Sequence, residues 1–195
     1  INRCLVGSEM CIRDSGFSST PRSAEFNKTL ITDRNSLDTA ITAWIADETA
    51  ATATYGDINT WDVRAITDFS ELFKDKTTFN SDISNWDVSS GTNFASMFQG
   101  ADAFNQDIGS WDVSSGTDFG YMFYNADAFN QDIGSWNVSS GTDFGSMFSG
   151  ADAFNQDISS WDVSSGNDFS AMFSWADAFN QNIGYWKVSD TATLD

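Results

Sequence analysis

Aspartates that recur every 25 residues are the side chains in this sequence best suited to chemistry. One column of them precedes an isoleucine, and another follows a tryptophan. Calcium takes about six to eight oxygen ligands, and carboxylates are among its preferred donors. Two carboxylates about 5 Å apart also repel each other, by roughly 0.8 kcal/mol in water and about 3 kcal/mol at an effective dielectric of about 20. Hydrogen bonds or cations must therefore compensate for the repulsion along such a column. The candidate cation ligands are Asp82, Asp107, Asp132, Asp157, Asp87, Asp112 and Asp162.

Three interpretations of these columns remain open: a specific calcium site, general screening by cations, and hydrogen bonding to backbone or solvent. The sequence has neither a D-x-D-x-D-G calcium loop nor a glycine-rich nonapeptide calcium repeat. Catalysis is not expected, because a catalytic pair needs one environment that separates two pKa values, whereas Asp107 and Asp112 recur from repeat to repeat. The chain has no histidine, and its two cysteines are Cys4 and Cys11. We therefore expect no enzyme and no cofactor, with calcium as the alternative.

Composition narrows the class of partner. The 195 residues include 28 Asp and Glu against 9 Lys and Arg, which gives a net charge of -19. Such a surface repels phosphate backbones, so nucleic acid is not an expected partner. No apolar run approaches the roughly 20 residues that span a bilayer, and no positively charged leader with an apolar middle is visible. With 41% apolar residues, the chain is expected to form one folded domain.

The repeat also predicts the structural elements in which the aspartates lie. Isoleucine, tryptophan and valine recur as I-x-x-W-x-V at a constant spacing of 25, and phenylalanine fills three further columns. A period between about 20 and 50 residues is typical of a solenoid, because one unit cannot bury its apolar face without a neighbour. Apolar columns more often form a core than a surface for sugar stacking. We therefore expect Trp86, Trp111, Trp136 and Trp161 inside.

Two kinds of spacing are present within one repeat. Trp86 and Val88 alternate, as in a strand with one buried face. Phe94, Met97 and Phe98 have the i, i+3, i+4 spacing of one helical turn. These spacings predict an α/β solenoid of 25-residue coils, with a parallel sheet and short helices.

The segment before the repeats has a different composition. Residues 4–15 resemble a translated sequencing adapter, so we expect residues 1–15 to be adapter-derived and disordered. Residues 16–35 are expected to form a lead-in. Apolar residues at helical spacing then predict a capping helix over residues 36–56, with Ser36 as its N-cap.

The repeats themselves are expected to form the solenoid over residues 57–188, with about five and a half coils. Residues 189–195 are expected to be a truncated tail, because the last coil stops without an obvious cap. The chain is accordingly interpreted as a fragment whose anchor lies beyond Asp195.

The stretch MFQGADAFNQDIGSWDVSSGTDF, residues 97–119, resembles the repeat of the BspA-like leucine-rich-repeat surface proteins, found in mycoplasma-type lipoproteins. The resemblance implies right-handed coils of the leucine-rich-repeat type, a cell-surface or extracellular location, and no catalytic residues. Two columns depart from the family pattern. Glycine replaces an apolar residue after Ser-Ser, as at Gly116, and phenylalanine replaces methionine after Thr-Asp, as at Phe119. We interpret this paired change as a larger ring that fills the space beside glycine.

We therefore expect a noncatalytic cell-surface or secreted repeat protein that acts in adhesion or protein–protein interaction. Its partner would be an unidentified protein or glycan. The alternatives are an acidic cation-binding structural array and a carbohydrate-binding wall. A specific contact would use positions that vary between repeats, because identical columns only repeat one chemistry. The interaction candidates are Tyr121, Tyr124 and Trp175.

Overall fold

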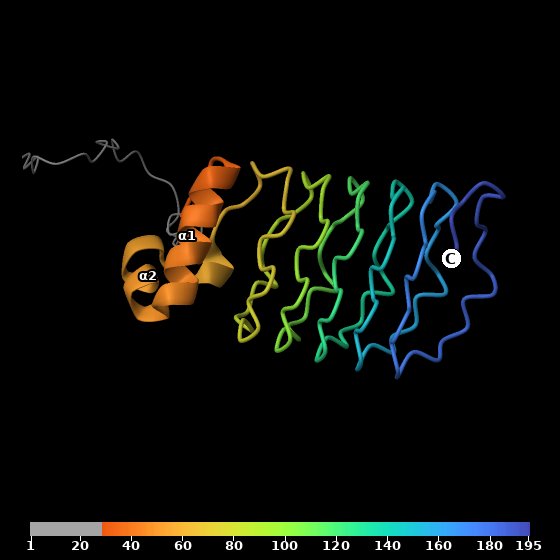
Figure 1. The fold of residues 1–195 in the computed structure, drawn as a ribbon. Coiled ribbons are helices and arrows are strands. Elements are labelled where there is room, and N and C mark those ends of the chain that lie inside the picture. Colours follow the sequence, from red (N-terminus) through yellow and green to blue (C-terminus); the bar gives the residue numbers. More distant parts are fainter. Residues whose placement is uncertain (1–28) are drawn as a thin grey trace, which may run out of the picture.

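The computed structural model describes residues 29–195, which form two α-helices followed by a row of stacked coils (Figure 1). The predictions for residues 1–15 and for most of the lead-in at 16–35 lie outside the described residues. Within the described part, neither helix is long and apolar enough to cross a membrane.

Helix α1 spans Arg34–Ala46 and is capped by Asp33. The Asp33 carboxylate accepts hydrogen bonds from the backbone N–H of Ser36 and from its hydroxyl, both at 2.9 Å. The prediction of Ser36 as N-cap is therefore wrong. The Asp33 carboxylate, three residues earlier, accepts from the first turn of the helix, so the helix begins before Ser36 and Ser36 lies within it.

A second aspartate divides the segment for which the sequence predicts one helix. Asp47 ends α1, and its side chain accepts from the Ala50 backbone N–H at 3.0 Å, so that it caps α2, Glu48–Tyr55. Gly56, with φ of 73°, ends α2, and a single 3-10 turn follows at Ile58–Thr60.

Helix α1 covers the first coil. Leu37, Ala40, Ile41 and Trp44 are buried, and the Trp44 ring meets the Trp61 ring edge-on with centroids 5.8 Å apart. The apolar face of α1 thereby closes the first end of the core that runs through the stack.

The prediction of an α/β solenoid with a parallel sheet and short helices is wrong. Residues 29–195 contain no strand, and beyond the 3-10 turn the coils contain no helix. Each pair of successive coils forms one isolated parallel bridge instead of a strand pair, and further backbone hydrogen bonds join the coils beside it. These bridges pair Asp68 with Asn93, Asn93 with Asp118, Asp118 with Asp143, Asp143 with Asp168, and Asp168 with Thr193.

The sheet is absent because the bonds between coils alternate with bonds inside the coil. Phe94 and Ser96 donate their backbone N–H groups to the next coil, both at 2.8 Å. Met97, in contrast, donates back to Phe94 at 3.2 Å, which closes a turn. Ser96 is left-handed, with φ of 56°, whereas a strand needs extended dihedrals at successive residues. The segment predicted to be a helical turn is therefore a run of turns that also joins neighbouring coils.

Identical aromatic rings stack along the core. The Phe98 and Phe123 centroids are 5.6 Å apart, as are those of Phe123 and Phe148. The expected placement of the tryptophans is confirmed, because Trp86, Trp111, Trp136 and Trp161 are all buried. Each indole N–H donates to an isoleucine carbonyl of the preceding coil, as Trp136 does to Ile108 at 3.1 Å. The tryptophan column therefore joins the coils by both packing and hydrogen bonding.

Candidate functional site

The seven candidate cation ligands are exposed, and each of them caps a turn of its own coil. Asp82 accepts from the backbone N–H of Ser84 at 2.9 Å, and Asp112 accepts from that of Ser114 at 3.0 Å. This is the aspartate turn, in which the side chain bonds the backbone two residues on. The equivalent bonds are made by Asp87, Asp107, Asp132, Asp157 and Asp162.

The turn bonds also affect ionisation. Hydrogen bonds from the side chain and backbone of Ser159 lower the pKa of Asp157, and those of Ser164 do the same for Asp162. Within residues 29–195, no three His, Cys, Asp or Glu side chains gather closely enough to hold a metal ion. The geometry therefore favours hydrogen bonding to the backbone among the three interpretations of these columns.

The sequence-based predictions omit a third aspartate column, which is more buried than the two columns of candidate cation ligands. Asp118, Asp143 and Asp168 are half-buried and adjacent along the stack. Burial raises the pKa of Asp143, a hydrogen bond from the Gly145 backbone lowers it, and the charges of Asp118 and Asp168 raise it further. The Thr-Asp pair repeats with the same period as the other columns, and that periodicity was the signal that could have revealed it.

Asp143→Asn is expected to stabilise the fold near neutral pH. The pKa of the Asp143 carboxyl is raised in the folded chain. The stability of the parent chain is therefore fully present below the pKa that Asp143 has in the unfolded chain, and part of it is lost as the pH rises through the pKa of the folded chain. Asn93 shows that an amide fits this column, since its Oδ1 accepts from the Ala95 backbone N–H at 3.0 Å. Thermal melts at about pH 7 should show a midpoint roughly 1–3 °C above that of the parent chain, and the difference should vanish below about pH 3.

Asp112→Asn is the matched control, with the opposite sign. Hydrogen bonds from the Ser114 side chain and backbone lower the pKa of Asp112. The ionised carboxylate of Asp112 therefore stabilises the fold above the pKa that it has in the unfolded chain, and this stabilisation is lost as the pH falls through its pKa in the folded chain. Asn137 occupies the equivalent position one coil later and accepts from the Ser139 hydroxyl at 2.7 Å. The control should melt at or below the parent midpoint at about pH 7. An equal rise in both variants would show that general relief of negative charge, and not burial, is the cause.

The interaction candidates lie on the edge of the stack formed by the runs of turns, which we call the turn edge (residues 67–75, 92–100, 117–125, 142–150 and 167–175). Tyr121 is 48% exposed, while its neighbours Met122 and Phe123 are fully buried. The left-handed backbone at Tyr121, with φ of 58°, places its side chain outside the core. The half-buried Tyr124 lies beside it, with ring centroids 5.6 Å apart.

Trp175 is the most exposed large apolar side chain in the described residues, at 81%. Its backbone is left-handed, with φ of 60°. The equivalent residues in the four preceding coils are Asp75, Gly100, Asn125 and Gly150, which are the residue types that tolerate this region. The structure brings Tyr121 and Tyr124 into contact and leaves Trp175 two coils further along the same edge.

Comparison with known proteins gives one match. A family model described as "Mycoplasma protein of unknown function, DUF285" matches residues 39–150 and again residues 117–195. The two matches overlap and together include part of α1, all of α2 and all the coils. No curated protein and no solved structure matches the chain.

Proposed function

We propose that this chain, which belongs to the family described as Mycoplasma protein of unknown function, DUF285, is a noncatalytic surface repeat protein that acts in adhesion or protein–protein interaction. The family match supports the assignment of the chain as a mycoplasma-type repeat protein. The resemblance of its repeat to BspA-like surface proteins supports the proposed role in adhesion or protein–protein interaction and a cell-surface or extracellular location. The contact surface in this proposal is the turn edge.

Trp175 is the observation that carries the proposal. A left-handed conformation costs roughly 1–2 kcal/mol for a residue with a side chain, and glycine avoids this cost. Four preceding coils use Asp, Gly or Asn at this position, so the fold does not require tryptophan there. Strain of this kind clusters at functional sites, and exposed tryptophan is enriched where proteins contact partners.

The test separates binding from stability. Trp175→Gly and Tyr121→Ser each install a residue that another coil already carries at that position, as at Gly150 and Ser146. We expect the double variant to melt at or above the parent midpoint, because the left-handed strain at Trp175 is relieved. On a protein and glycan array, its binding should be at least about tenfold weaker, because an aromatic contact of this kind is worth about 2 kcal/mol.

Ser84→Gly serves as a matched surface control, because glycine occupies the equivalent position in later coils, as at Gly109, and the position lies outside the turn edge. Retained binding by the double variant would exclude the turn edge as the contact surface. Signals confined to glycans would favour the carbohydrate-binding alternative over a protein partner.

A further inference from the structure

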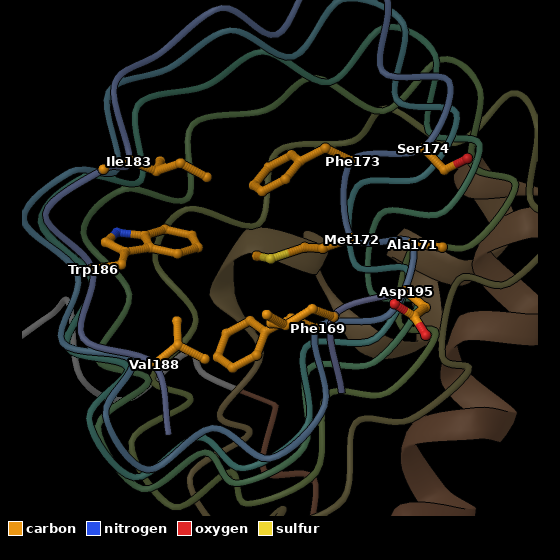
Figure 2. Close-up of a pocket in the computed structure, with 11 residues that line it drawn as sticks. Phe169, Ala171, Met172, Phe173, Ser174, Ile183, Trp186, Val188 and Asp195 are labelled. Carbon is orange, nitrogen blue, oxygen red and sulfur yellow. The ribbon is translucent and has the colours of Figure 1, made fainter. Parts of the chain in front are cut away.

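The turn edge presents two tyrosines to solvent beside residues that form the core. Figure 2, which looks along the stack, shows this alternation in a later coil, where Phe173 points into the core and Ala171 and Ser174 point away from it. Tyr121 and Tyr124 hold the equivalent positions two coils earlier. Coils stack on both sides of this pair, so its exposure does not arise from either end of the stack.

A row of aspartates borders the turn edge, two residues beyond each run of turns. We call it the aspartate row, and its members are Asp102, Asp127, Asp152 and Asp177. All four are exposed. Successive members are neighbours in space, because the Asp102 carbonyl accepts from the Ala128 backbone N–H at 3.1 Å. The row also lies close to the tyrosine pair, since the three residues from Tyr124 to Asp127 span at most about 11 Å.

Unlike the other aspartate columns, the aspartate row caps no turn. In residues 29–195 its carboxylates make no hydrogen bond and no ion pair. Thr77 occupies the equivalent position in the first coil, and its carbonyl accepts from the Ala103 N–H at 3.0 Å, as the Asp102 carbonyl does from Ala128. The stacking of the coils therefore uses only the backbone at this position, and the fold does not require a carboxylate there.

The charges of the aspartate row are not offset by the chain itself. Burial raises the pKa of Asp127, and the charges of Asp102 and Asp152 raise it further. No lysine or arginine occurs between residues 77 and 186. Nor do any three acids in the described part of the chain gather closely enough to hold a metal ion. The row therefore keeps a repulsion that cationic groups from outside the chain would relieve.

The spacing of the row restricts the shape of a cationic partner. Phe104 and Phe129, two residues beyond Asp102 and Asp127, have ring centroids 6.0 Å apart. Two residues of an extended chain advance by about 6.4–6.8 Å, and their side chains point to the same face. An extended segment with a basic residue at every second position therefore meets about one carboxylate per coil. Lysine and arginine are also attracted to the faces of tyrosine rings.

We propose that the turn edge and the aspartate row together form a docking surface for an extended, lysine- or arginine-rich segment of a partner protein. The segment runs across the coils, its cationic groups pair with the row, and one of them contacts the rings of Tyr121 and Tyr124. A second copy of the chain is a poorer occupant, because it carries the same acidic row. The inference rests on the proposed function, whose partner it assigns to a chemical class.

The probe is a fluorescein-labelled peptide of alternating lysine and serine, KSKSKSKSK, titrated with the full chain and followed by fluorescence anisotropy. We expect saturable binding that weakens between about 20 mM and about 300 mM NaCl, because salt screens exposed charges. A peptide with glutamate in place of each lysine should not bind. Tyr121→Ser with Tyr124→Ser, which installs the pair found at Ser146 and Ser149, should weaken binding roughly two- to fivefold.

Two triple variants separate the aspartate row from the general acidity of the chain. The row variant carries Asp102→Asn, Asp127→Asn and Asp152→Asn. The control variant carries Asp107→Asn, Asp132→Asn and Asp157→Asn. Both remove three charges from the same coils, but the control column precedes the isoleucine column, which lies across the coil from Phe173, as Ile183 does in Figure 2. Asparagine keeps the turn there, because Asn182 accepts from the Gly184 N–H at 3.0 Å.

The row variant should bind the peptide at least about tenfold more weakly than the parent, and the control variant within about threefold of it. The row variant should also melt at or above the parent midpoint, because repulsion is relieved. Equal weakening in both variants, or binding that salt does not affect, would overturn the proposal.

The array described above separates this inference from the proposed function. A partner lost by the variant with Trp175→Gly and Tyr121→Ser but kept by the row variant would overturn this inference and leave the proposed function standing. A partner kept by both variants would overturn both. A partner lost by both, with a lysine- or arginine-rich segment, is the result expected.

Discussion

Trp136→Ala is expected to destabilise the fold by about 3–5 kcal/mol, the range seen when a large buried aromatic side chain is removed. Trp136 is buried in a central coil and packs against rings on both sides of it. Its centroid lies 6.4 Å from that of Phe123 and 6.4 Å from that of Trp161. The truncation leaves a cavity that stacked neighbours of fixed spacing cannot fill. Urea unfolding followed by circular dichroism measures the loss.

Trp136→Phe separates packing from hydrogen bonding at the same position. Phenylalanine keeps an aromatic ring but cannot donate to the Ile108 carbonyl, which accepts from the indole N–H at 3.1 Å. The Ile108 carbonyl still accepts from the Trp111 backbone N–H at 3.1 Å, so it loses one of two hydrogen bonds, at a cost of about 0.5–1.5 kcal/mol. We expect the phenylalanine variant to lie between the parent and the alanine variant. A loss below about 1 kcal/mol for Trp136→Ala would contradict a core that depends on the tryptophan column.

Gly141→Ala is expected to destabilise the fold by about 1–3 kcal/mol through overpacking. A Cβ at this position would lie 2.4 Å from the Phe144 ring and 3.0 Å from the Val138 carbonyl oxygen. The ring cannot move aside, because Phe119 and Phe169 stack on its two faces with centroids 5.6 and 5.3 Å away. The same denaturant measurement detects the change.

Two variants test that reason for the loss. Gly184→Ala is the matched control, because its Cβ would meet only the Asn182 side chain, and we expect a change within about 0.5 kcal/mol. The double change Gly141→Ala with Phe144→Met restores the pairing expected from the family pattern, and it should recover part of the loss. A double variant no better than Gly141→Ala alone would show that the ring is not the obstacle.

Much of the core could be predicted from the period alone. An identical residue every 25 positions has identical neighbours in each coil, so the tryptophan and phenylalanine columns had to stack. The interpretation of the glycine and phenylalanine columns as a matched pair is confirmed by the close approach of Gly116 to the Phe119 ring, where an added Cβ would lie 2.4 Å away.

The secondary structure could not be predicted in the same way. The spacing of Phe94, Met97 and Phe98 fits a helical turn, but it fits two linked turns equally well. The difference lies in the left-handed backbone at Ser96, with φ of 56°, and serine gives no sign of that conformation in the sequence. Local spacing was therefore a poor guide where hydrogen bonds to neighbouring coils determine the backbone.

The candidate site was predicted in part. The aspartate columns were identified, but only the structure shows that their carboxylates bond to the backbone two residues on. The column that contains Asp143 was overlooked, because the spacing around it suggested the start of a helix. Tyr121 and Trp175 were identified by their variation between repeats, while the left-handed backbone that exposes them needed coordinates.

The near-identity of the interfaces between successive coils has a mechanical consequence. Each coil is held to the next by the same set of backbone hydrogen bonds, stacked rings and indole–carbonyl bonds, so no inner interface is much stronger than another. Force applied through the two ends of the chain would detach coils one at a time, and each would release 25 residues, or roughly 80–90 Å of extended chain. A chain built in this way would lengthen in equal steps under load.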